Sequence, residues 1–256
     1  MTEFKNADLR GARFEEVEMN GAVLHAVDLS DAQFRSVDLS RVVMRGVDLI
    51  DVDIHGDIEN LVINGVDVAP LIEAELDRRN PLRPKMRPVD PNGFREAWAI
   101  LDRLWEGTVD RARRFTPDQL HESVNGEWSF IETIRHLAFA TDSWVRRAIL
   151  GDRSPWDPLG LPFAEWPDGP EFSRAVNARP SLDEILALRR DRTATVRDYI
   201  ASLTTESLES DTTPVDAPGW PPPKSYSVRR CLLVVLNEEW QHRLYAERDL
   251  DVLEAR

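Results

Sequence analysis

The sequence contains a single cysteine, Cys231, among 256 residues. One cysteine excludes an internal disulfide and any zinc motif built from several cysteines, and it fits a reducing compartment. A metal site in this chain would therefore have to use histidine and carboxylate ligands.

The chain also lacks an excess of positive charge and any long apolar run. The net charge of −14 disfavours nonspecific binding to nucleic acid and to anionic membranes, because both need clustered lysine and arginine. No run approaches the roughly 20 apolar residues of a membrane-spanning helix, and the N-terminal residues do not resemble a secretion signal. We therefore expect a cytoplasmic protein with small-molecule partners, no nucleic-acid or membrane partner, and a homodimer as one option for its assembly.

A large apolar residue recurs at every fifth position of the N-terminal segment, a period that neither an α-helix nor a flat strand has. Two positions before most of these residues lies a small or β-branched residue, often followed by aspartate, as in Ala7-Asp8-Leu9. The pattern resembles the pentapeptide-repeat family. The large residues are Phe4, Leu9, Phe14, Met19, Leu24, Leu29, Phe34, Leu39, Met44, Leu49 and Ile54.

This resemblance implies a right-handed quadrilateral β-helix, with one repeat on each side and the apolar columns inside. The period degrades over residues 56–60, and we interpret residues 61–68 as a closing strand segment. Residues 69–79 are predicted to form a short helix that completes a C-terminal cap, because stacked coils need their ends covered. The first domain is thus predicted to span residues 1–79.

Prolines then interrupt helix formation repeatedly over residues 80–90, which predicts a linker. Residues 91–256 are predicted to form an all-α four-helix bundle, so the chain as a whole is an α+β multidomain protein. Ser129, Ser181 and Thr116 each have a glutamate or glutamine three residues later, the pattern of a helix N-cap. The four long helices are expected at residues 90–114, 129–150, 181–203 and 227–254.

Two connections in the predicted bundle, residues 151–180 and 204–226, are much longer than those between neighbouring bundle helices. They carry Trp156, Trp166 and Trp220 among many prolines. This composition fits ordered lids or crossovers, and it fits surface covers over the bundle ends equally well.

Glu238 and His242 are four residues apart, so they lie on one face of the last predicted helix. His136 lies seven residues after the start of the helix at 129–150, at the same height if the two helices run antiparallel. On spacing alone, two simpler interpretations compete with a metal site. His136 could be a hydrogen-bonded histidine at the edge of the core, and Glu238 and His242 a solvated pair.

At these residues the chain resembles the DinB-like four-helix-bundle superfamily, particularly its mycothiol-dependent branch. The resemblance covers residues 90–254 and is carried by Trp128-Ser129, by Ile134-Arg135-His136-Leu137 and by residues 236–243. Glu238 occupies the position where most of these proteins have a histidine, and the thiol-dependent branch has glutamate there. The resemblance implies that His136, Glu238 and His242 bind a divalent ion, zinc in the first place or nickel or another metal.

The leading functional hypothesis is a metal-dependent enzyme in which the ion activates a low-molecular-weight thiol such as mycothiol, or water, for transfer to or isomerisation of a small electrophile. No catalytic residue is assigned.

The rival hypothesis is a non-catalytic interaction protein with the bundle as a structural or sensor module. Residues 1–68 hold 14 acidic and 6 basic residues, a net charge of −8 that suits a DNA mimic. Three coils would make a rod only about 15 Å tall, which favours a scaffold or oligomerisation role instead.

The remaining histidines and the cysteine are not predicted to be ligands. Cys231 lies about 10 Å along the helix axis from Glu238 and is interpreted as a small buried residue. His25 and His55 occupy outward positions of the repeats, and His121 has no visible ligand partner.

Overall fold

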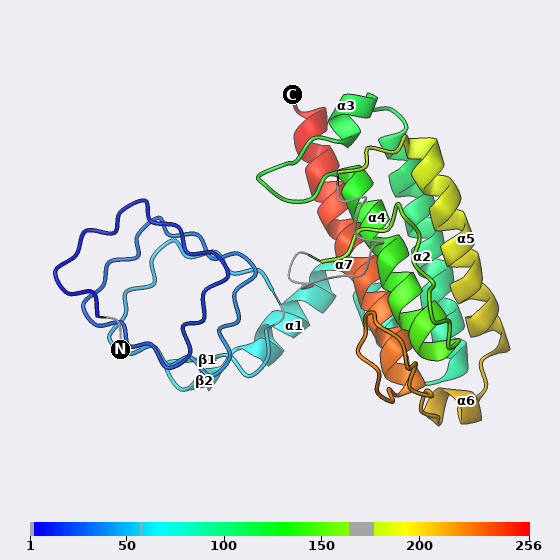
Figure 1. Ribbon diagram of the computed structural model, residues 1–256, viewed down its shortest axis with the longest axis horizontal. Coiled ribbons are helices and arrows are strands. Elements are labelled where there is room, and N and C mark those ends of the chain that lie inside the picture. Colours follow the sequence, from blue (N-terminus) through cyan, green and yellow to red (C-terminus); the bar gives the residue numbers. More distant parts are fainter. Residues whose placement is uncertain (1–2, 57, 164–176) are drawn as a thin grey trace. The chain divides into compact units, whose positions relative to one another are not determined.

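The computed structural model describes residues 3–56, 58–163 and 177–256. The chain forms two compact units, of which the first ends at Gly56 and the second comprises the rest (Figure 1). The predicted domain limits at residues 79 and 90 stay predictions.

The backbone of the first unit has the five-residue period of its sequence. A positive φ angle occurs at every fifth residue from Asn6 to Gly56. At alternate repeats a turn is closed by a hydrogen bond such as that from the Ala12 amide to the Leu9 carbonyl, 2.9 Å long. No strand occurs among residues 3–56, and Phe4 and Leu9 of the apolar column are 65% and 45% exposed. The β-helix therefore stays a prediction.

The second unit begins with a hairpin rather than the single closing strand expected over residues 61–68. Strands β1 (Val62–Ile63) and β2 (Val66–Asp67) pair antiparallel. Asn64 and Gly65 between them have φ angles of 51° and 83°. Two successive positive φ angles at Asn-Gly define the type I′ turn that favours tight hairpins, so this dipeptide reverses the chain. The short helix predicted next is present as α1, Ala69–Arg79.

The proline-rich segment after α1 packs against the rest of the second unit. It contains a 3-10 helix, η1 (Arg83–Met86), whose Met86 is 6% exposed in the bundle core. The Arg83 guanidinium lies 2.8 Å from Glu73 and 2.7 Å from Asp77, two carboxylates of α1. Prolines thus end the helix, while buried apolar contacts and ion pairs fix the segment that follows.

The four long helices lie within two residues of their predicted bounds. Helix α4 (Phe130–Thr141) has α5 (Leu182–Ser202) and α7 (Val228–Glu254) as neighbours, and so does α2 (Pro91–Ala112), which gives a four-membered bundle. The second predicted helix is a regular α-helix only as far as Thr141 and continues as a π-helix. The elements are α2 (Pro91–Ala112), α3 (Pro117–Leu120), α4 (Phe130–Thr141), η2 (Asp142–Ile149), α5 (Leu182–Ser202), α6 (Thr205–Glu209) and α7 (Val228–Glu254).

The helix starts follow from their caps. At Ser129 and Ser181 the serine side chain accepts a hydrogen bond from the amide three residues later, and the glutamate there accepts one from the serine amide. Thr116 and Gln119 form the same reciprocal pair at α3. Each of these three predicted caps is confirmed, and each fixes where an apolar stripe begins to face the core.

Helix direction explains the length of the first long connection. Figure 1 shows α4 and α5 running in the same direction, whereas α7 runs opposite to α4. The chain must therefore return along the bundle between α4 and α5. Residues 151–163 begin this return, and the Leu161 amide donates to the Arg135 carbonyl of α4 at 3.1 Å. This connection is a crossover; Trp166 lies outside the described residues. Within the described ranges, no helix has the length and apolar character needed to cross a membrane.

Candidate metal centre

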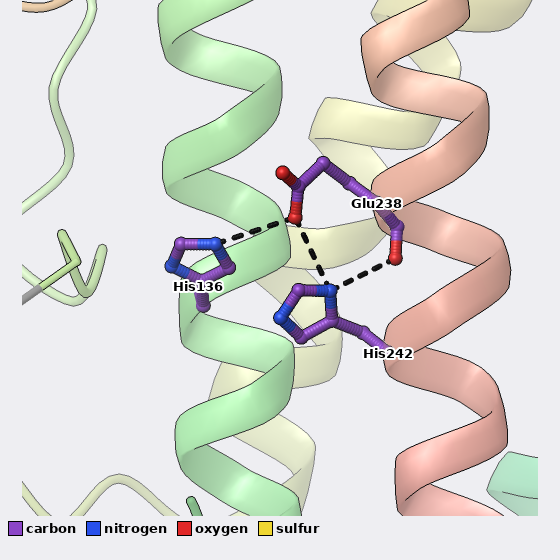
Figure 2. Close-up of side chains that lie close together, drawn as sticks. All are labelled: His136, Glu238 and His242. Atoms are coloured by element: carbon purple, nitrogen blue, oxygen red, sulfur yellow. Dashed lines mark hydrogen bonds and ion pairs between the residues drawn. The ribbon is translucent and has the colours of Figure 1, made fainter. Parts of the chain in front are cut away.

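Side chains from two antiparallel helices converge in the second unit. His136 extends from α4, and Glu238 and His242 extend from successive turns of α7 (Figure 2). Oε2 of Glu238 lies 3.5 Å from Nε2 of His136 and 3.2 Å from Nδ1 of His242. One donor atom from each of the three residues lies within 4.8 Å of the others. The structure thus brings together the three residues that the sequence predicted as ligands.

The orientation of His136 is fixed by a backbone carbonyl. Nδ1 of His136 lies 3.0 Å from the carbonyl oxygen of Leu161 in the crossover. A carbonyl oxygen only accepts hydrogen bonds, so Nδ1 carries a proton, and in the neutral form of the ring the lone pair is on Nε2. This lone pair is the one that faces Glu238.

His242 is oriented in the same way from its own helix. Its Nδ1 lies 3.0 Å from the carbonyl oxygen of Glu238, one turn earlier. Nδ1 therefore donates the hydrogen bond, and Nε2 of the neutral ring is left with a lone pair.

The donor set fits a divalent cation. Nε2 of His136 and Oε2 of Glu238 lie 3.5 Å apart. While the imidazole is neutral, both atoms are hydrogen-bond acceptors, so no hydrogen lies between them. A proton or a cation at this place removes the repulsion. Zinc–ligand bonds of about 2.0–2.1 Å place tetrahedral donors about 3.3 Å apart, close to the observed spacing. Imidazole and carboxylate are also ligands for nickel and other divalent ions.

Two of the three groups are in the protonation state that a cation requires, for different reasons. Burial and the neighbouring His136 lower the pKa of His242 to about 4. Burial by itself would raise the pKa of Glu238, but its interactions with His136 and His242 outweigh burial, so this pKa lies below its ordinary value. Near neutral pH, His242 is therefore uncharged and Glu238 is ionised.

Aromatic rings line the two histidines of the site. The Trp128 ring lies 4.5 Å from the ring of His136 and 6.0 Å from that of His242, measured between centroids. Phe139 lies 6.1 Å from His136, and Tyr245 lies 5.8 Å from His242. Such walls limit the access of water and so strengthen electrostatic interactions at the site. Trp128 belongs to the sequence motif noted above, but its place beside both histidines was not predicted.

The other histidines and the cysteine lie apart from this cluster. Nε2 of His121 lies 3.0 Å from the Pro180 carbonyl, and His55 pairs with Asp53 at 3.2 Å on the surface of the first unit. His25 is exposed. Cys231 is fully buried, and burial raises its pKa to about 11. Throughout the described parts of the chain, His136, Glu238 and His242 form the one group of three residues able to hold a metal ion.

Two contributors to the site were missed at the sequence level, the Leu161 carbonyl and the Arg135 side chain. A backbone carbonyl leaves no trace in the sequence. Arg135 did leave one, because it is an arginine inside the otherwise largely apolar run from Phe130 to Ala140 and is 0% exposed. A buried arginine needs acceptors, and this requirement could have directed attention to the crossover.

A four-helix bundle with a three-donor site between antiparallel helices, preceded by a five-residue repeat, defines a two-part protein with a helical domain competent to bind metal. A family model described as DinB superfamily matches residues 100–246, more than half of the chain. The model for pentapeptide repeats matches residues 2–41 and 28–56, with eight copies. The chain therefore belongs to the DinB superfamily and carries N-terminal pentapeptide repeats. Domains of this superfamily bind divalent metals and are often enzymes. No curated protein and no solved structure matches the chain.

Two buried groups are expected to change stability in opposite directions over one pH range. Asp142 forms a buried bidentate pair with Arg192, at 2.8 and 3.1 Å, and burial, only partly offset by Arg192, raises its pKa to about 6. Its folded pKa lies above the unfolded value, so its contribution to stability is gained as the pH falls from about 6 to about 4. The pKa of His242 is lowered, so its contribution is lost as the pH falls from about 6.5 to about 4.

Each of these contributions amounts to about 3 kcal/mol at full extent. In metal-free protein the two should largely cancel, and urea unfolding at a series of pH values will test this. Asp142→Asn should make the loss of stability in acid steeper, and His242→Gln should make it shallower or reverse it. Unfolding curves that keep the same pH dependence in both variants would contradict the assignment.

Proposed function

We propose that the protein is a divalent-metal-dependent enzyme in which His136, Glu238 and His242 hold the ion. The observation that carries the proposal is the convergence of their donor atoms within 4.8 Å. Three protein ligands leave at least one coordination position open, the arrangement of catalytic rather than structural zinc. Zinc is the ion we expect first, with nickel as the alternative.

The nucleophile is proposed to be a small thiol from solution. A divalent ion, when bound, lowers the pKa of a coordinated thiol or water and supplies a nucleophile at neutral pH. The chain offers no thiolate of its own, because Cys231 is fully buried and burial raises its pKa to about 11. A low-molecular-weight thiol such as mycothiol fits this requirement, and the reaction is proposed to be its transfer to a small electrophile or a thiol-dependent isomerisation.

The residues around the ligands support this proposal by their positions. Trp128 and Phe139 lie against His136 and present apolar surface beside the donor atoms. They would exclude water from the reacting atoms and give an electrophile a surface on which to pack. The backbone carbonyls of Leu161 and Glu238 hold the two imidazole rings in place.

The thiol step can be tested separately from metal binding. Protein loaded with Co²⁺ should develop a near-ultraviolet thiolate-to-cobalt charge-transfer band when mycothiol is added, and glutathione and cysteine serve as comparison thiols. Stoichiometric cobalt binding without such a band for any of the three thiols would reject the thiol step while leaving the metal site intact. Activation of water would then be the better description of the chemistry.

For the first unit we propose the quadrilateral β-helix and a role as a scaffold or oligomerisation element. Support comes from the positive φ angle at every fifth residue from Asn6 to Gly56, which gives one bend for each repeat. The net charge of −8 over residues 1–68 also fits a DNA mimic. A topoisomerase supercoiling assay distinguishes these roles, because inhibition by excess protein would favour mimicry over the scaffold.

A further inference from the structure

The described residues of the crossover between α4 and α5 form hydrogen bonds with α4 on both sides of His136. The Leu161 amide donates to the Arg135 carbonyl at 3.1 Å, and the Leu161 carbonyl accepts from Nδ1 of His136 at 3.0 Å. Nε of Arg135 donates to the Leu159 carbonyl at 2.8 Å. We call the short segment 159–161 the strap. Arg135 holds the strap in place, and the strap in turn orients the ring of His136.

Arg135 also reaches the far end of the crossover. Its Nη1 donates to the carbonyl of Ala178, 3.0 Å away, just before the start of α5. The side chain is 0% exposed, so these bonds are made in a medium of low polarity, where an unmade bond to a charged group is costly. One guanidinium thus joins Leu159 and Ala178, on either side of the middle of the crossover, to the helix that bears His136.

We propose that Arg135 is a positioning residue of the metal centre. It fixes the strap so that the Leu161 carbonyl selects the tautomer of His136 with the proton on Nδ1, which leaves the lone pair of Nε2 facing Glu238. The inference rests on the proposed metal site for its consequence, but the tautomer itself is a property of the metal-free protein. Partners of this kind orient the ligands of metal sites, and their loss typically costs about 10–100-fold in metal affinity.

Gly160 gives an independent way to disturb the strap. A Cβ atom at this position would lie 3.2 Å from the Asp157 carbonyl oxygen and 3.7 Å from Cβ of Phe139. Gly160→Ala therefore crowds the strap against the Asp157 carbonyl just before it, and makes an ordinary contact with Phe139 of α4, without changing Arg135 or any charge.

Arg147 provides a matched control. This η2 residue is 1% exposed and donates to the carbonyls of Val215 and Pro221, 3.3 Å each, in the other long connection. Arg147→Lys and Arg135→Lys both remove a buried guanidinium fork that fixes a connection to the same long helical segment. Only Arg135→Lys changes a residue next to His136.

The experiment measures both the tautomer of His136 and the affinity of the protein for zinc. Nitrogen-15 NMR of the metal-free protein, at a pH where imidazole is neutral, reports the tautomer of His136, and competition with a chelator gives the zinc dissociation constant. In wild type and Arg147→Lys we expect the Nδ1–H tautomer and equal affinity. In Arg135→Lys we expect a mixture of tautomers and about 10–100-fold weaker binding, and in Gly160→Ala a smaller change in the same direction.

Wild-type tautomer in both Arg135→Lys and Gly160→Ala would overturn the inference, as would an equal change in Arg147→Lys. If Arg135→Lys does not fold, Gly160→Ala decides between the two outcomes alone. Failure of the proposed function looks different, because wild-type protein would then bind no metal while the tautomer still depended on Arg135.

Discussion

His136→Ala and His242→Ala should each abolish stoichiometric binding of divalent metal, whereas His121→Ala should bind metal like the wild type. Each of the first two changes removes one of three donor atoms that lie within 4.8 Å of one another. Loss of a ligand should lower metal affinity by more than the roughly 10–100-fold that is typical for outer-shell changes. Metal content of the purified variants and calorimetric titration with zinc measure the effect.

Thermal unfolding gives a second readout of the same result. Metal that binds only the folded state stabilises it by about 4 kcal/mol when its free concentration is 1,000 times the dissociation constant. Zinc should therefore raise the melting temperature of the wild type and of His121→Ala, but not that of the two ligand variants. His121 is a fair control because its Nε2 bonds the Pro180 carbonyl, away from the cluster. Equal metal content in all four proteins would rule out the proposed ligand set.

The parts of the fold that could be predicted are those controlled by local rules. Ser129 with Glu132 and Ser181 with Glu184 mark helix starts because a cap involves residues only three positions apart. Glu238 and His242 share a face because four residues make about one helical turn. The partner on the other helix, His136, needed the resemblance to the DinB-like superfamily in addition to spacing, since the direction of two helices is a tertiary property.

The features that could not be predicted depend on contacts between residues distant in sequence. The Leu161 carbonyl lies 25 residues from His136, and only the path of the crossover brings it to Nδ1. That path follows from α4 and α5 running in the same direction, which the sequence does not specify. The hairpin at Asn64-Gly65 is a different case. Its Asn-Gly turn signal is local and present in the sequence, within the residues 61–68 that we interpreted as a closing strand segment.

Removing one partner of a buried ion pair beside the site should give a large loss of stability. Both oxygens of Glu239 accept from Arg189, at 3.1 and 2.7 Å, and the two residues are 2% and 8% exposed. Arg189→Met would leave the carboxylate buried without its partner, which typically costs about 3–5 kcal/mol. Urea unfolding of metal-free protein measures this loss. The double variant Arg189→Met/Glu239→Leu should recover much of it, because replacing both charges removes the desolvation penalty.

The same pair of variants separates the stability of the bundle from the geometry of the metal centre. Glu239 follows Glu238 directly, and its backbone carbonyl accepts a hydrogen bond from Nε1 of Trp105 at 3.2 Å, so α7 is held at this height from both α2 and α5. If the ion pair sets the register of α7, the double variant should regain stability but keep a weaker zinc affinity than the wild type. If the Trp105 bond and core packing suffice, affinity should return together with stability. A double variant no more stable than Arg189→Met would show instead that the loss comes from the missing guanidinium over Trp105, whose ring centroid lies 4.3 Å from the guanidinium carbon.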